Sequence, residues 1–251
     1  MGNVLGIDVG GSGIKGALVD LTVGDFAGDR LRIPTPKKST PANCAEVIVK
    51  IIESFSDDLG DGPIGVTVPA PVVHGTVPLM ANLDKAWNGL PATAFLTQEV
   101  GRPITLINDA DAAGLAEVYY GAARDVPGVV ILLTLGTGIG SAIIHNGVLL
   151  PNCELGHLEL DGFDAEKRAS SGVKEKEDLS YEVWAKRLDR YIGHVEMLFS
   201  PDLFVIGGGI SKNYRQFLPL LHLRTPIVPA QLRNRAGIIG AAWAAVNMAA
   251  A

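Results

Sequence analysis

The sequence predicts an α/β fold built from two similar units, each a βββαβα arrangement. Two apolar strands, at residues 3–9 and 129–136, each run into a glycine-rich turn and then into a second strand. Aligning Asp8 with Thr134 gives an offset of 126 residues (134 − 8 = 126), about half of the 251-residue chain. Because similarity at a fixed offset indicates an internal repeat, we interpret the chain as a duplication of one α/β unit.

The first half supplies the elements of one unit in order. Residues 3–9 and 13–21 indicate a hairpin, and a third strand is expected near 29–33. Thr40 followed by Pro41 predicts the start of a helix that runs to about Phe55. The remaining expected elements are strands at 62–68 and 104–108, a loop at 81–90, and helices at 91–99 and 111–120.

The second half repeats this order. A hairpin at 129–136 and 140–147 is followed by a long helix at 180–199, with Ser180 as its N-cap. Residues 203–211 indicate a strand that ends in glycines before a further helix, and 236–251 an Ala-rich terminal helix. We therefore expect two lobes, residues 1–122 and 123–251, with the last helix packing back on the N-terminal lobe.

The bulk composition excludes several classes of protein. Hydrophobic residues make up 47% and charged residues 19%, as in an ordinary folded protein, and no apolar run is long enough to span a membrane. The net charge of −6 argues against general nucleic-acid binding. Cys44 and Cys153 form neither a zinc motif nor a disulfide framework, and no signal peptide precedes the first strand. These features predict a cytoplasmic protein with no nucleic-acid and no membrane partner.

Three glycine-rich turns, at 8–17, 135–142 and 206–211, each follow an apolar strand. Glycine lets backbone N–H groups point into a concave turn, which can bind an anion such as phosphate. Ser12, Thr137 and Ser141 add hydroxyl groups, and Lys15 adds a positive charge. The chain contains no GxxxxGK[ST] motif, and a strand rather than a helix follows the first turn, which argues against a dinucleotide fold.

These turns, together with NDADAAGLAE (108–117) and ELGHLEL (154–160), resemble the ROK family of sugar kinases and repressors. The resemblance implies an actin-like ATPase (hexokinase/ribonuclease H-like) fold with a cleft between two lobes, and a homodimer. Further segments, including SSGVKEKEDLSYEVWAK (170–186), resemble its polyphosphate-dependent glucokinase branch. That branch implies phosphoryl transfer from polyphosphate or ATP to the 6-hydroxyl of glucose, with mannose as a second acceptor. No cysteine follows His157, so we expect no zinc site.

Asp109 is the candidate catalytic base. On the residues alone, Asp109 or Asn108 could equally cap the helix that follows, and Asp111 would be the cap or an acid of the first turn. The family resemblance assigns Asp109 the role of accepting the proton of the sugar hydroxyl.

Sugar hydroxyls are expected to be bound by polar side chains of both halves. The resemblance gives Asn82, Asn108, Asp109, Glu154 and His157, with Glu159 and Glu166 as alternatives for a further glutamate. Trp87 could stack on the sugar ring or belong to the core.

The donor is expected at the glycine turns. The candidate phosphate and nucleotide ligands are Asp8, Gly10, Gly11, Ser12, Lys15, Gly136, Thr137, Gly138, Gly208, Gly209 and Lys174, with Asp8 holding Mg²⁺ through water. A polyphosphate chain would also need cations, for which Lys15, Arg168, Lys174, Lys176, Lys212 and Arg215 are candidates, although a mixed run such as 173–178 is more often a solvated face.

Three other functions remain open at this point. The chain could be an ATP-only hexokinase of the ROK family acting on another hexose. It could be a catalytically idle sugar sensor of that family, against which an intact Asp109 argues. A phosphate-binding structural protein of the actin type is a third reading, against which the ELGH motif argues.

Overall fold

The computed structural model describes residues 3–248. Internal contacts divide the chain into two compact units: unit 1 runs to Ala116 and resumes at Arg235, and unit 2 runs from Glu117 to Asn234. The division falls within helix α4 (Asp109–Tyr120), near the lobe boundary predicted at residues 122 and 123.

Unit 1 is built on a mixed sheet. Strand β1 is antiparallel to β2 and parallel to β5, and β5 is parallel to β6. The order is β3-β2-β1-β5-β6, with β4 also paired to β2. The strands are β1 (Val4–Gly10), β2 (Gly13–Asp20), β3 (Asp25–Phe26), β4 (Leu31–Ile33), β5 (Ile64–Val68) and β6 (Ile104–Asn108). The strand expected near 29–33 is β4, and the two-residue β3 before it was not predicted.

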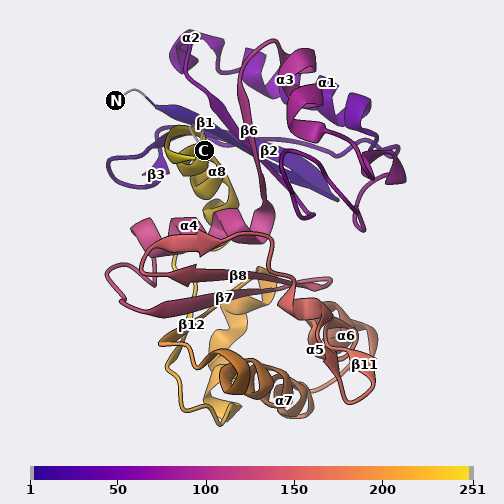
Figure 1. The fold of residues 1–251 in the computed structure, drawn as a ribbon, viewed down its shortest axis with the longest axis vertical. Coiled ribbons are helices and arrows are strands. Elements are labelled where there is room, and N and C mark those ends of the chain that lie inside the picture. Colours follow the sequence, from indigo (N-terminus) through magenta and orange to yellow (C-terminus); the bar gives the residue numbers. More distant parts are fainter. Residues whose placement is uncertain (1–2, 249–251) are drawn as a thin grey trace. The chain divides into compact units, whose positions relative to one another are not determined.

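Helices cover both faces of this sheet (Figure 1). Helices α1 (Pro41–Glu53) and α3 (Ala92–Val100) pack on one face, beside the short α2 (Ser56–Leu59), and α8 (Ala236–Asn247) packs on the other. A Cβ atom on Gly6 would collide with the carbonyl oxygen of Ile238, so glycine is what lets α8 approach β1. Residues 249–251 of the expected terminal helix lie outside the described residues.

Two sequence interpretations in unit 1 can be settled. The Thr40 hydroxyl accepts a hydrogen bond from the Asn43 amide at 3.3 Å, so Thr40 is the N-cap of α1 as predicted. Trp87, in a 3₁₀ turn at Lys85–Trp87, is fully buried, and its indole N–H donates to the Ser39 carbonyl. Trp87 therefore belongs to the core, and its interpretation as a sugar-stacking platform is wrong.

Unit 2 repeats the architecture. Its main sheet has the order β13-β12-β7-β8-β9, in which β7 is antiparallel to β8 and parallel to β12. The strands are β7 (Val129–Leu135), β8 (Ile139–His145), β9 (Val148–Leu150), β12 (Leu203–Gly207) and β13 (Ile227–Pro229). A separate hairpin joins β10 (Glu159–Leu160) to β11 (Phe163–Asp164).

Helix α7 (Tyr181–Phe199) packs its apolar side against the main sheet of unit 2. Its side chains Trp184, Leu188 and Tyr191 are buried in one cluster with Ile131 and Leu133 of β7. Ser180 accepts a hydrogen bond from the Val183 amide and caps α7, as predicted. The shorter elements are α5 (Glu166–Ala169), α6 (Ser171–Lys176) and 3₁₀ turns at Leu155–His157 (η2), Gly209–Gln216 (η3), Leu218–Leu220 (η4) and Arg233–Arg235 (η5).

The two sheets show the predicted duplication. In each unit the first strand is antiparallel to the second and parallel to a later one, so the strand orders correspond. Asp8 lies opposite Lys15 and Thr67, and the equivalent Thr134 lies opposite Gly140 and Gly207. The segment after β12 differs from expectation, because it forms a 3₁₀ turn kinked at Asn213. Within residues 3–248, no helix combines the length and the apolar character that crossing a membrane requires.

Candidate active site

The catalytic segment lies where β6 meets α4 in unit 1. Asn108 Oδ1 accepts hydrogen bonds from the amides of Ala110 at 2.8 Å and Asp111 at 3.0 Å, so Asn108 is the N-cap. Asp109 is half-buried at the first position of α4, where the positive end of the helix dipole favours a carboxylate. The capping role therefore belongs to Asn108, and Asp111 is a buried first-turn acid rather than the cap.

The first glycine turn, residues 10–13, is held by side chains from later in unit 1. The Thr35 hydroxyl donates to the Gly10 carbonyl, and Arg32 Nη2 donates to the Ser12 carbonyl at 2.8 Å. A Cβ atom on Gly13 would lie 2.7 Å from Arg32 Nε, so the guanidinium lies directly against the turn. Arg32 was not among the residues predicted from the sequence, and the pairing of β4 with β2 places it opposite Lys15.

Three further predicted ligands, Asn82, Asp8 and Lys15, lie at or beside this turn. A Cβ atom on Gly11 would lie 3.5 Å from the Asn82 carbonyl oxygen, so the structure brings the exposed Asn82 to the first turn. Lys15 Nζ donates to Asp8 Oδ2 at 2.9 Å, and the buried Thr67 hydroxyl donates to Asp8 Oδ1 at 3.0 Å. Each Asp8 oxygen keeps a second lone pair, so the carboxylate fits the expected contact to Mg²⁺ through water.

The second glycine turn, residues 136–138, is tied to helices α5 and α6. The Gly136 N–H donates to the Gly138 carbonyl at 3.0 Å, and the Gly136 carbonyl accepts from the Gly172 amide at 2.9 Å. Among the described residues, none accepts a hydrogen bond from the amides of Thr137 or Gly138. Those two N–H groups can therefore point at a phosphate, whereas the Gly136 amide is used within the turn.

The Glu-Leu-Gly-His motif is fixed against β8. The Ser141 hydroxyl donates to the Cys153 carbonyl and accepts from the Leu155 amide at 2.8 Å. A Cβ atom on Gly156 would collide with the carbonyl oxygen of Ile139, which explains why the motif contains glycine. Ser141 is buried, so it anchors this segment, and its interpretation as a phosphate-binding hydroxyl is wrong.

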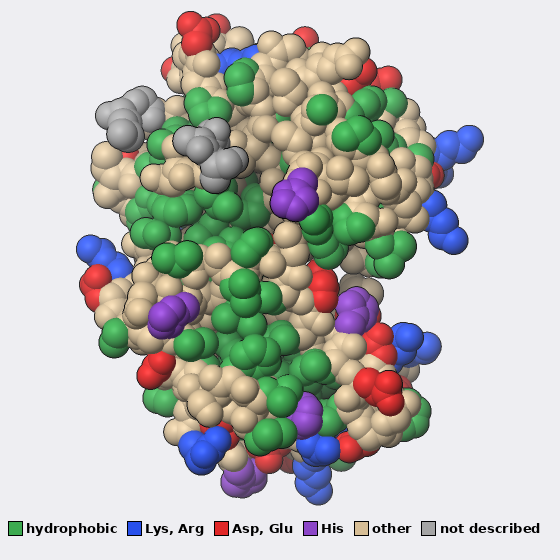
Figure 2. Space-filling model, viewed as in Figure 1, with side chains coloured by type: hydrophobic (Ala, Val, Ile, Leu, Met, Phe, Trp, Pro, Cys, Tyr) green, Lys and Arg blue, Asp and Glu red, His purple; other side chains and the backbone are tan. Residues whose placement is uncertain are grey.

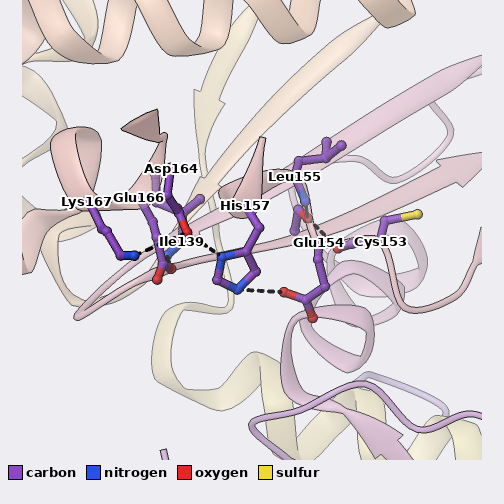
Figure 3. Close-up of polar contacts among 9 residues, drawn as sticks. Ile139, Cys153, Glu154, Leu155, His157, Asp164, Glu166 and Lys167 are labelled. Atoms are coloured by element: carbon purple, nitrogen blue, oxygen red, sulfur yellow. Dashed lines mark hydrogen bonds and ion pairs between the residues drawn. The ribbon is translucent and has the colours of Figure 1, made fainter. Parts of the chain in front are cut away.

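His157 lies between two carboxylates (Figure 3). Its Nδ1 is 3.0 Å from Asp164 Oδ2, and its Nε2 is 4.0 Å from Glu154 Oε2. The hydrogen bond to Asp164, aided by the nearby carboxylates of Glu166 and Glu154, raises the pKa of His157 above its ordinary value. Burial of part of the Glu154 side chain raises the pKa of that carboxyl, against the opposing effect of His157. This cluster can both accept and donate hydrogen bonds, as binding of a sugar hydroxyl requires.

Of the two alternative glutamates, only Glu166 lies close to His157. Glu166 Oε2 accepts from the Ile139 amide at 3.0 Å, and a Glu166 oxygen lies within 4.8 Å of ligand atoms of His157 and Asp164. Glu159 is exposed on β10, outside this cluster. One nitrogen and two carboxylates could hold a cation, so the absence of a zinc site stays a prediction.

Asp164 was not predicted as a site residue, although the sequence contains a signal for its position. Asp161-Gly162, flanked by LEL and FDA, is typical of a two-residue β-hairpin. The hairpin pairs Asp164 with Glu159, two residues after His157. This pairing brings the Asp164 carboxylate to the His157 ring.

The third glycine turn lies at the end of β12. Gly208 has φ +81°, and a Cβ atom there would collide with the Leu135 carbonyl oxygen, so the turn packs closely on the end of β7. Gly209 has open space around the position of a Cβ, which leaves room for a ligand.

Two of the basic residues expected to line a polyphosphate track lie against aromatic rings. The Arg168 guanidinium lies 3.5 Å above the Phe163 ring, and Lys174 Nζ lies 4.3 Å from the centroid of Tyr181. Lys176, Lys212 and Arg215 are exposed. On the face shown in Figure 2, Lys and Arg side chains are interspersed with Asp and Glu, so that face has no continuous basic surface.

The residue pattern and the fold agree with the comparisons to known proteins. Residues 4–175 match the model of the ROK family. The chain is 53% identical to the polyphosphate glucokinase of Mycobacterium tuberculosis over 242 residues, which cover 96% of this chain and 90% of the relative. The inorganic polyphosphate/ATP-glucomannokinase of Arthrobacter sp. strain KM is 51% identical, with a TM-score of 0.94 and coverage of 99% and 100%.

A more distant structure supports the fold alone. The ROK family glucokinase of Streptomyces griseus, solved with glucose and AMPPNP, is 23% identical, with a TM-score of 0.81 and coverage of 96% and 98%. The matched strand orders of the two units and these likenesses show the actin-like ATPase fold with two lobes, and the chain belongs to the ROK family.

Proposed function

We propose that the chain is a sugar kinase that transfers a phosphoryl group from polyphosphate or ATP to the 6-hydroxyl of glucose. The names of its relatives support the reaction and both donors. The observation that carries the proposal is the cluster of Glu154, His157 and Glu166, whose hydrogen-bonding groups suit a polyhydroxyl ligand.

Each predicted residue has a role in this reaction. Asp109 accepts the proton of the attacking hydroxyl, which typically contributes about 10²–10⁴-fold to the rate. Asn108 keeps its amide NH₂ for a sugar oxygen, since its Oδ1 caps α4. Glu154, His157 and Glu166 bind and orient the sugar hydroxyls, and Asn82 joins them as predicted from the family.

The donor is bound through the glycine turns. The amides of Thr137 and Gly138, with Ser12 and Lys15, hydrogen-bond phosphate oxygens, and Gly208 and Gly209 border the nucleotide when ATP is the donor. Bound Mg²⁺ would neutralise charge on the donor phosphates. Asp8 would hold it through water, and Lys15 and Thr67 keep that carboxylate in one orientation.

An assay of both acceptors with both donors tests the proposal. Glucose or mannose is supplied with ATP or long-chain polyphosphate, and hexose 6-phosphate is measured with and without EDTA. We expect turnover of glucose with both donors, and loss of turnover on chelation of the metal. Mannose is included because the Arthrobacter relative is named a glucomannokinase. Binding of glucose without turnover under any condition would instead indicate the idle sensor.

The polyphosphate track needs a separate test. If Lys174 contacts polyphosphate, Lys174→Ala raises the KM for polyphosphate more than the KM for ATP. Lys186→Ala, which removes an exposed lysine of α7, is the matched control. Equal changes for both donors would remove Lys174 from the track. The homodimer stays a prediction, which light scattering on the purified protein can check.

A further inference from the structure

A short hairpin follows His157 and returns the chain to it. Strands β10 and β11 pair Glu159 with Asp164 and Leu160 with Phe163, leaving Asp161 and Gly162 as the turn. Their φ angles of 55° and 80° are those of a type I′ turn, which suits a two-residue hairpin. The hairpin brings the Asp164 carboxylate behind the imidazole, seven residues along the chain from it.

The hydrogen bond to Asp164 determines which imidazole nitrogen carries the proton. Asp164 Oδ2 lies 3.0 Å from His157 Nδ1, and an ionised carboxylate can only accept. The proton of the neutral ring is therefore assigned to Nδ1, which donates to Asp164. Nε2, on the side of Glu154, keeps its lone pair and can accept a hydrogen bond from a hydroxyl group (Figure 3).

We propose that Asp164 is a positioning residue for sugar binding, which holds the His157 ring and its Nδ1–H tautomer so that Nε2 and Glu154 act on the same hexose. The inference rests on the proposed function, because it assigns His157 to the sugar. Asp164 itself touches the imidazole and acts on the sugar only through it.

The surroundings of Asp164 show that its carboxylate is kept at a cost to stability. Asp164 Oδ1 is buried and has no hydrogen-bond partner among the described residues, which is unfavourable for a polar atom. Lys167 Nζ lies 3.9 Å from the other oxygen, Oδ2, and is largely exposed. The hydrogen bond to His157 is thus the main interaction that this carboxylate makes, as expected if orienting the ring is its role.

The hairpin is held in place by residues other than those of the His157 cluster. Asp161 at its tip pairs with Arg190 of α7 at 2.7 Å, and Arg168 packs over the Phe163 ring. These contacts hold Asp164 in place without involving the imidazole. Asp161 therefore offers a matched control, because it is a carboxylate of the same hairpin with a partner of its own.

The first measurement is made on the full chain without sugar. Long-range ¹H–¹⁵N NMR of the imidazole, assigned with His157→Gln, reports its tautomer and pKa. The charged groups that face the ring are Glu154, Asp164 and Glu166, with Lys167 beyond Asp164. We expect the Nδ1–H form and a raised pKa in the wild type, a lowered pKa and mixed tautomers in Asp164→Asn, and wild-type behaviour in Asp161→Asn.

The second measurement is kinetic. Asp164→Asn should raise the KM for glucose about tenfold, roughly the effect of losing one hydrogen bond to a charged group. The KM for the donor should change less than twofold, and Asp161→Asn should leave both values near those of the wild type.

An unchanged imidazole pKa and tautomer in Asp164→Asn would overturn the proposal, and so would an unchanged KM for glucose. If the wild type phosphorylates no hexose, the proposed function fails, and the NMR comparison of Asp164→Asn with Asp161→Asn then decides whether Asp164 positions the ring.

Discussion

The two glycine turns at the starts of the repeats have the same backbone setting and different chemistry. The first, at 10–13, is held by the side chains of Arg32 and Thr35 and lies beside an acid, Asp8. The second, at 136–138, is held by hydrogen bonds from α6, and Thr134 stands where the first repeat has Asp8. The two units thus share a strand order, while the side chains that hold each turn differ.

The second turn has instead become joined to the sugar motif. Glu166 accepts from the Ile139 amide at the end of the turn and also lies in the cluster with His157 and Asp164. Gly156 packs on the Ile139 carbonyl, and Ser141 holds the Cys153 carbonyl and the Leu155 amide. We infer that the first repeat mainly supplies catalytic charge, and that the second couples donor binding to sugar binding.

The largest expected effect tests the catalytic charge of the first repeat. Asp109→Asn keeps the size of the side chain at the start of α4 and removes its ability to accept a proton. We expect kcat to fall by about 10²–10⁴-fold, the usual contribution of a positioned base. Glucose affinity, measured by calorimetry, should change little, because the base acts mainly in the transition state. Turnover near that of the wild type would remove Asp109 from its assigned role.

The next effect tests the coupling in the second repeat. Glu166→Ala removes the carboxylate at the start of α5, which accepts from the Ile139 amide and lies near His157 and Asp164. Glu159→Ala removes an exposed carboxylate of β10 as a control. We expect the KM for glucose to rise roughly 10- to 100-fold for Glu166→Ala, as for loss of a charged hydrogen bond. For Glu159→Ala the KM for glucose should stay within twofold of the wild-type value. A larger rise for Glu159→Ala than for Glu166→Ala would instead assign the sugar contact to Glu159.

Local signals in the sequence were sufficient for the longer strands and helices of each unit and for two helix caps. The caps Thr40 and Ser180 and the glycines after β1, β7 and β12 follow from short-range chemistry that each segment carries by itself. The family motif proposed Asp109 and His157 as site residues, and the similarity of the two predicted hairpins indicated the repeat. The position of Asp164 could have been predicted from the Asp161-Gly162 turn that precedes it.

Other features depend on packing between distant segments, which spacing alone does not reveal. Ser141 looked like a phosphate ligand, but its hydroxyl is buried against Cys153 and Leu155. Trp87 could have faced a sugar, but the tertiary fold buries it. The contact of Arg32 with the first turn needs the pairing of β4 with β2, and β4, with three residues, is shorter than a periodicity argument can detect.

A smaller effect compares the turns directly. Gly136 has open space around the position of a Cβ, so Gly136→Ala should leave the fold intact or stabilise it by about 0.4–1 kcal/mol through the unfolded state. Gly13→Ala must displace the Arg32 guanidinium, and loss of its hydrogen bond to Ser12 should destabilise the protein by about 1 kcal/mol.

Urea denaturation of the two variants measures this difference in stability. The KM of each variant for the donor shows whether the turn also contributes to donor binding. If Gly136→Ala is fully stable and still binds the donor poorly, the second turn lies against phosphate. Equal destabilisation of both variants would show that the two turns are held in the same way.

The smallest effect concerns pH and the His157–Asp164 pair. The pKa of His157 is raised in the folded protein, first by its hydrogen bond to Asp164. Protonated His157 therefore stabilises the fold below its unfolded pKa of about 6.5, and this stabilisation is lost as pH rises through the folded pKa. Because the His157 side chain is 53% exposed, solvent screening limits the contribution to a few tenths of a kcal/mol, roughly.

Asp164→Asn should accordingly lower the free energy of unfolding more at pH 5.5 than at pH 9, as measured by calorimetry at both values. Asp161→Asn removes an ion pair with Arg190 that does not involve the imidazole, so its penalty should be the same at both pH values. A pH-independent penalty for Asp164→Asn would mean that its carboxylate does not interact with the titrating imidazole. The hairpin would then be a structural feature of the second repeat, and the coupling of that repeat to the sugar would rest on Glu166 alone.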